Sequence, residues 1–140
     1  MTLLLKRNLW LRGASVLAVL FGLLTLKEGG TVLFGNEAAR SAAGAYVPFV
    51  LWFNFLAGFA YVAAGMALWR RLGWAAWLAL GIGLATALVF AAFGIHVLMG
   101  GAFEVRTVGA MALRTVVWLG IGTLALRLRP GHAARGETTP

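Results

Sequence analysis

The sequence predicts an all-α fold: an integral membrane four-helix bundle with both termini on the cytoplasmic side. Three observations lead to this prediction. Hydrophobic residues make up 61% of the 140-residue chain and charged residues only 11%, a balance outside the range of soluble domains. The apolar residues fall into four runs separated by short charged breaks, and a helix needs about 20 apolar residues to cross a bilayer. The basic residues gather at one set of run ends, which sets an orientation.

The predicted spans cover about residues 9–26, 47–69, 72–99 and 108–126. They make residues 1–129 a single domain and residues 130–140 a flexible cytoplasmic tail. The first run is the shortest, and it reaches across only if Arg12 and Lys27 extend toward opposite surfaces. A secretory signal peptide is disfavoured because no small-x-small cleavage site follows Leu26. Helices are the spanning form because the runs lack the residue alternation of barrel strands.

Residues 27–46 are the longest predicted connection, an outer loop that Gly29 and Gly30 interrupt near its start. Asn36 is expected to cap a short helical turn that runs through Ala43. Small residues recur within the spans, and they predict close packing of the helices.

The net charge of +8 is concentrated at alternate span ends. On the side that carries both termini, the basic residues are Lys6, Arg7, Arg12, Arg70, Arg71, Arg127, Arg129 and Arg135. On the other side, Lys27, Arg40 and Arg106 are balanced by Glu28, Glu37 and Glu104. The positive-inside rule therefore predicts a multi-pass protein of the bacterial inner (plasma) membrane with both termini cytoplasmic. Because topology explains the basic residues, nucleic-acid binding is disfavoured.

Several kinds of chemistry are disfavoured by composition. The chain has no cysteine, which excludes disulfides, thiol catalysis, iron–sulfur clusters and thiolate metal sites. No serine is well placed near His96 and no span has a central carboxylate, so neither hydrolysis nor proton-coupled export is favoured. Haem ligation by two histidines is disfavoured because the second one, His132, lies in the tail. The sequence therefore disfavours an enzymatic function, and it does not identify a cofactor.

A cluster of polar residues in the outer half of the spans is the candidate ligand-binding site. Arg114 lies roughly 10 Å below the outer end of the fourth span at helical rise. A charge is costly at such a depth, and ionisable residues inside membranes are usually functional. The predicted ligand-binding residues are Lys27, Glu28, Asn54, Tyr61, His96, Glu104, Arg106, Arg114 and Trp118.

These residues are predicted to form an outward-facing pocket roofed by residues 27–46. Arg114 would hold the head of the ligand, Glu104 would set the position of Arg114, and His96 would be the proton-active group. Trp118 would close the floor through a cation–π contact with Arg114. A cationic surplus beside apolar walls favours an amphiphile with an anionic or carbonyl head, such as a lipid or a quinone. The leading hypothesis is therefore a ligand-binding membrane protein, either alone or as an accessory subunit of a membrane redox or transport complex.

Two other functions fit the same residues. In the first, the protein is a structural or assembly subunit: an Arg114–Glu104 pair pins the outer ends of two spans, and His96 hydrogen-bonds the loop. In the second, the protein handles copper(I) through His96, Met99 and Met111, because imidazole and thioether groups suit that ion. A homo-oligomer and a larger membrane complex are both compatible with the sequence.

Three segments resemble the DoxX-like group of small four-helix bacterial membrane proteins. They are FGLLTLKEGG at 21–30, FLAGFAYVAAGMAL at 55–68 and VFAAFGIH at 89–96. The resemblance extends to about residue 100 and implies an all-helical membrane bundle. In some members, such a bundle is an accessory subunit of a quinone-linked oxidoreductase. Residues 100–115, which contain Arg114, have no counterpart in this pattern.

Overall fold

The computed structural model describes residues 1–129, and this part of the chain is helical without any strand. Its helices are α1 (Thr2–Phe34), α2 (Glu37–Ala43), α3 (Pro48–Trp69), α4 (Ala75–Leu98) and α5 (Val105–Arg127). The helices α1, α3, α4 and α5 are each long and apolar enough to cross a membrane. The all-α prediction is therefore confirmed, as is the presence of four helices able to span a bilayer. The predicted tail, residues 130–140, lies outside the described residues.

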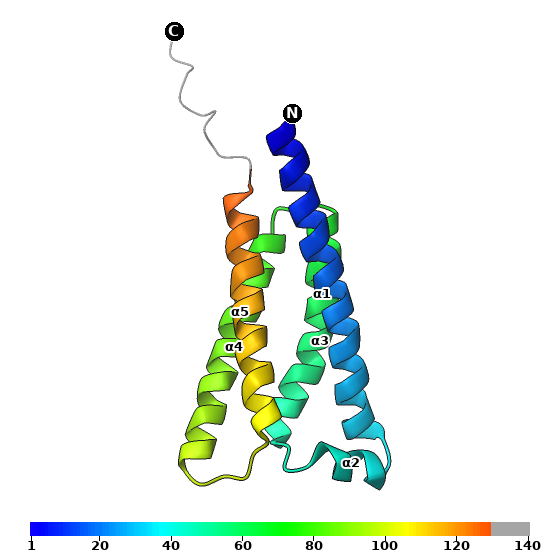
Figure 1. The fold of residues 1–140 in the computed structure, drawn as a ribbon, viewed down its shortest axis with the longest axis vertical. Coiled ribbons are helices and arrows are strands. Elements are labelled where there is room, and N and C mark those ends of the chain that lie inside the picture. Colours follow the sequence, from blue (N-terminus) through cyan, green and yellow to red (C-terminus); the bar gives the residue numbers. More distant parts are fainter. Residues whose placement is uncertain (130–140) are drawn as a thin grey trace.

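The four long helices run alongside one another (Figure 1). α1 begins and α5 finishes at the same end, which we call the terminal end. α2 and the connection between α4 and α5 lie at the opposite end, which we call the α2 end. α1 packs mainly against α3, and α4 packs mainly against α5, while contacts between α3 and α4 join the two pairs.

Large apolar side chains cover the outside of the four long helices. Leu20, Leu56, Leu88 and Val116, one from each helix, are all more than half exposed. Soluble proteins rarely expose apolar surface of this extent. Such a surface is suited to contact with lipid.

α1 extends further than the predicted span at residues 9–26. The sequence prediction ends the span near Leu26, where Lys27 interrupts the apolar run and two glycines follow, but the helix continues to Phe34. Gly29 is buried against α3, where an added Cβ would lie 3.2 Å from the Cβ of Phe55. This glycine therefore allows α1 to approach α3 instead of ending α1. The predicted outer loop is correspondingly shorter.

α2 forms where the sequence predicts a capped turn. The Asn36 side chain accepts a hydrogen bond from Ala39 N–H at 3.0 Å, which satisfies one of the free amides at the start of the helix. This prediction is confirmed. Pro48 then opens α3, at a position where its missing N–H costs little.

Small residues let α1 and α3 approach closely along their length. An added Cβ on Gly22 would lie 2.8 Å from Val62 and 2.9 Å from the carbonyl oxygen of Gly58. Nearer the terminal end, the Ser15 hydroxyl donates a hydrogen bond to the carbonyl of Gly65. This pairing through small residues is a common way for membrane helices to associate.

The main core lies between the two helix pairs. It is built around Tyr61 and Trp118, which are fully buried, with alanines of α3, α4 and α5 around them. A smaller core near the α2 end contains Val50, Phe93 and Met111. The main core thus lies in the middle of the bundle, and the helices enclose a separate space between this core and the α2 end.

Candidate functional site

A pocket of about 530 Å³ opens at the α2 end of the fold, within the usual size range of small-molecule sites. Its walls come from the last turns of α1, from α2, and from the first half of α3 and of α5. The predicted site residues that line this pocket are Lys27, Glu28, Asn54, Glu104, Arg106 and Arg114. The structure thus brings six of the nine predicted residues to one cavity.

Arg114 lies at the inner side of the pocket, with 9% of its surface exposed. Its guanidinium carbon lies 5.5 Å from the ring centre of Phe21 on α1, which is within cation–π range. The sequence prediction assigns this contact to Trp118, and the structure corrects it to Phe21. Trp118 lies one turn further along α5, where its ring packs on Tyr61.

Glu104 is engaged with the loop instead of with Arg114. Its Oε1 accepts a hydrogen bond from Ala45 N–H at 2.8 Å. The Nε of Arg114 is buried without a hydrogen-bond partner among the described residues. The predicted role of Glu104 in setting the position of Arg114 is therefore corrected: Glu104 holds the loop that leads into α3.

Buried polar atoms without hydrogen-bond partners are concentrated at this site. Four of them belong to predicted site residues: Asn54 Oδ1, the Tyr61 hydroxyl, Arg114 Nε and Trp118 Nε1. Within residues 1–129, the remaining such atom is Asn8 Oδ1, far away in the first turns of α1. Buried polar atoms in proteins nearly always have a partner, which can be water or a ligand. Two of these atoms, Asn54 Oδ1 and Arg114 Nε, belong to residues that line the pocket.

An aromatic column closes the pocket toward the middle of the fold. The ring centres of Phe21 and Tyr61 are 5.6 Å apart with nearly parallel planes, and those of Tyr61 and Trp118 are 4.7 Å apart. The Tyr61 hydroxyl comes near the side chains of Arg114 and Thr86 without reaching the geometry of a hydrogen bond. Tyr61 and Trp118 therefore support the pocket from beneath and do not line it.

Charged side chains fasten the roof of the pocket. Arg106 donates from Nη2 to the carbonyl oxygens of Ala42 at 3.3 Å and Ala43 at 3.0 Å, which satisfies free carbonyls in the last turn of α2. Gly44 follows with a φ of +72°, and an added Cβ there would collide with the Glu104 carboxylate. The first turn of α5 and the residue before it thus hold α2 over the pocket.

The rim contains residues that the sequence prediction includes and others that it misses. Lys27 and Glu28 lie on the exposed rim. Thr25, Tyr46 and Thr107 also line the pocket, although none of them is predicted. A signal for Thr25 does exist, because the inner face of α1 repeats small or polar residues at helical spacing. These residues are Ser15, Ala18, Gly22, Thr25 and Gly29.

His96 lies outside the pocket, in the last turn of α4. Its Nε2 is 3.1 Å from the carbonyl oxygen of Ala102, and its ring meets Phe49 edge-on at 6.3 Å between ring centres. An added Cβ on Gly101 would collide with the imidazole. This placement corrects the prediction of a proton-active His96 inside the pocket. It matches the hydrogen bond to the loop that the structural alternative predicts.

The copper hypothesis requires His96, Met99 and Met111 to converge, but these residues lie in different surroundings. Met99 is 82% exposed, whereas Met111 is fully buried in the smaller core. Within residues 1–129, no group of three or more His, Cys, Asp or Glu residues is placed to hold a metal ion. The different surroundings of Met99 and Met111 therefore argue against a shared copper site with His96.

Comparisons with protein-family models, with curated proteins and with solved structures found no match for this chain. The resemblance to the DoxX-like group stays a prediction, and the function has to be inferred from the site itself.

Proposed function

We propose that this protein is a multi-pass membrane protein that binds the head of an amphiphilic ligand, a lipid or a quinone, in the pocket at the α2 end. Arg114 carries the proposal, because it lines a cavity of about 530 Å³ and its Nε has no hydrogen-bond partner among residues 1–129. A guanidinium only donates hydrogen bonds, so it requires an oxygen acceptor. A ligand that brings this oxygen satisfies the group.

Arg114 and Asn54 define the chemistry of the head. The guanidinium offers its N–H groups to a carbonyl, carboxylate or phosphate oxygen. Asn54 adds an acceptor, or a donor if its amide is turned over. The apolar side chains of Val32, Leu51 and Ala110 complete the lining, and they suit the apolar part of an amphiphile.

In this proposal the pocket faces the outer side of a bacterial inner membrane. The basic residues at the terminal end have no acidic counterpart among residues 1–129, whereas at the α2 end the charges outside the span, Lys27, Arg40 and Arg106 against Glu28, Glu37 and Glu104, balance. The positive-inside rule then places the terminal end in the cytoplasm. A ligand would enter from the outer leaflet, and the protein would act alone or as an accessory subunit of a membrane redox or transport complex.

The test is binding of two defined probes, decylubiquinone with a carbonyl head and oleate with a carboxylate head. Native mass spectrometry of the detergent-purified protein would measure how much of each probe stays bound. We expect a one-to-one complex with at least one probe, and we expect Arg114→Gln to weaken it at least tenfold. Arg127→Gln is the matched control, because it removes the same charge from the same helix outside the pocket.

Two results would overturn the proposal. One is the absence of a complex with either probe when the protein remains folded. The other is a complex that Arg114→Gln and Arg127→Gln weaken equally, because that result would reflect net charge and not the pocket.

A structural or assembly subunit is the second candidate, and the contacts of Glu104 and Arg106 favour it. Glu104 bonds to the backbone of the α2–α3 connection and Arg106 bonds to the backbone of the last turn of α2, so both act within the fold. If this function holds, Arg114→Gln lowers the stability of the protein and leaves the amount of bound lipid unchanged. The same measurements therefore separate the two candidates.

A further inference from the structure

A second pocket lies at the terminal end, on the opposite side of the molecule from the proposed ligand site. Its volume is about 510 Å³. Leu11 of α1, Leu68 of α3, Ala76 of α4 and Ala125 of α5 contribute to its apolar walls. All four long helices therefore meet around this pocket.

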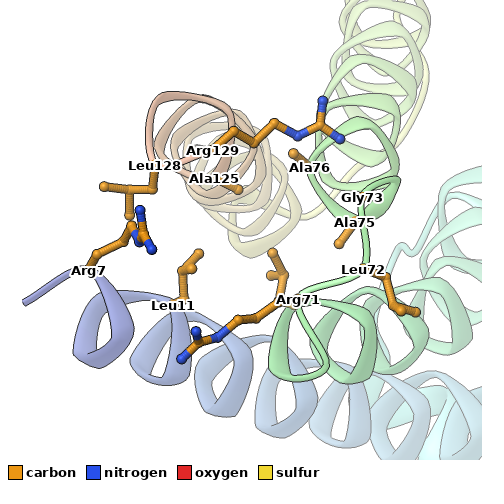
Figure 2. Close-up of a pocket in the computed structure, with 11 residues that line it drawn as sticks. Arg7, Leu11, Arg71, Leu72, Gly73, Ala75, Ala76, Ala125, Leu128 and Arg129 are labelled. Atoms are coloured by element: carbon orange, nitrogen blue, oxygen red, sulfur yellow. The ribbon is translucent and has the colours of Figure 1, made fainter. Parts of the chain in front are cut away.

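Three arginines from three different elements also line this pocket. Figure 2 shows Arg7 on α1, Arg71 in the turn between α3 and α4, and Arg129 just beyond the end of α5, spaced around the cavity. The guanidinium of Arg129 is held over the ring of Trp77, at 5.8 Å from its centre. These arginines give the pocket a charged rim above an apolar interior.

The described part of the chain supplies no acidic partner for this rim. The acidic residues of residues 1–129 are Glu28, Glu37 and Glu104, and all of them lie at the α2 end. Among the described residues that line the pocket, none is acidic. A ligand with negative charge would therefore complement the rim.

The turn that carries Arg71 adopts an unusual backbone conformation. Arg71 has a φ of +54°, the single positive φ at a non-glycine residue in residues 1–129. This left-handed conformation is unfavourable for a residue with a Cβ. It closes the short turn between α3 and α4 and places the Arg71 side chain at the pocket.

We propose that this pocket binds an anionic phospholipid, with its negatively charged headgroup attracted to the rim by Arg7, Arg71 and Arg129 and an acyl chain along the apolar walls. Basic pockets between membrane-spanning helices suit anionic headgroups in this way. The orientation signal explains why positive charge gathers at the terminal end, but it does not explain which residues line the cavity. The sequence neighbours Lys6, Arg70 and Arg127 carry the same charge and do not line it.

Those neighbours provide a matched test. The pocket variant combines Arg7→Gln, Arg71→Gln and Arg129→Gln. The control variant combines Lys6→Gln, Arg70→Gln and Arg127→Gln, and it removes the same net charge at positions one or two residues away along the chain. Each protein would be titrated in detergent with dioleoylphosphatidylglycerol and with dioleoylphosphatidylcholine, and native mass spectrometry would report the bound lipid.

We expect the wild type and the control variant to prefer phosphatidylglycerol over phosphatidylcholine. The pocket variant should lose this preference, at about fivefold per arginine removed. Equal loss in both variants would overturn the proposal, because general surface charge would then account for binding. Absence of any preference in the wild type would overturn it as well.

Two further measurements complete the test: a competition with a soluble phosphate ester and a comparison of single variants. Glycerol 3-phosphate carries the phosphate without acyl chains, so it should not displace phosphatidylglycerol, and efficient displacement would point to a free-phosphate site. If the triple variant does not fold, the single variants Arg7→Gln and Lys6→Gln make the same comparison in the first turns of α1. We expect weaker phosphatidylglycerol binding for Arg7→Gln alone, and equal binding by the two variants would refute the pocket.

Discussion

Replacing Arg114 with methionine is expected to make the ligand-free protein more stable. Methionine is of similar length, has no charge and adapts to irregular space. Arginine at this position leaves Nε buried without a hydrogen-bond partner in residues 1–129, which costs about 2 kcal/mol. Its contact with Phe21, at 5.5 Å, returns about 1 kcal/mol. The free energy of unfolding should therefore rise by about 1 kcal/mol, the difference between these two effects.

The measurement is an unfolding titration in mixed detergent micelles, followed by far-ultraviolet circular dichroism. Bound lipid is first removed by extended washing, and its absence is checked by native mass spectrometry. Arg127→Met is the control on the same helix, and it should change stability by less than about 0.5 kcal/mol. Phe21→Leu removes the cation–π contact together with the stacking of Phe21 on Tyr61, so it should lower the stability.

A fall in stability of about 1 kcal/mol or more for Arg114→Met, with Arg127→Met unchanged, would refute this reasoning. It would mean that Arg114 has a partner within the folded protein, as a structural role requires. At a saturating ligand concentration, the wild type should become more stable than Arg114→Met, because binding stabilises only the protein that can bind. Decylubiquinone is the probe for that second measurement.

Three more substitutions test the contacts that shape the site. Gly44→Ala should destabilise the protein by about 1–2 kcal/mol, because its φ is +72° and an L-residue is unfavourable there. The control is Gly120→Ala, where nothing lies within 4 Å of an added Cβ. Equal thermal stability of the two variants would contradict the argument. Gly22→Val should separate α1 from α3 and lower the melting temperature by several degrees. Gly13→Val, which has open space around the added side chain, should lower it much less. A similar fall in melting temperature for both variants would mean that the β-branched side chain alone is the cause. Glu104→Ala should speed amide hydrogen exchange in residues 43–46, because the loop loses its bond to the carboxylate, and an unchanged exchange rate would contradict the assigned role.

The positions of the membrane-spanning helices are largely predictable from the sequence, because span length and apolar composition are local properties. The end of α1 is not, because glycine can either end a helix or permit close packing. Which of these happens at Gly29 depends on Phe55, a residue of another helix. The capped start of α2 is predictable because Asn36 acts on an amide three residues away.

The candidate site also has features that the sequence predicts and features that it does not. The depth of Arg114 follows from counting residues along a helix, so its burial is predictable. Its neighbour is not, because the choice between Phe21 and Trp118 depends on how each helix is rotated about its own axis. The same rotation carries His96 away from the pocket and toward Ala102. The spacing of residues in the sequence does not determine how each helix is rotated about its axis.

The length of α1 determines where the ligand pocket sits in the bilayer. At 1.5 Å per residue, Arg7 and Lys27 lie about 30 Å apart along α1, which equals the thickness of the hydrocarbon core. The pocket, which α1 lines from Thr25 to Val32, then stands at the level of the lipid headgroups. A ligand could slide in sideways from the leaflet while its head stays hydrated. Occupancy of the pocket would then follow the concentration of the ligand in the membrane and not its concentration in water.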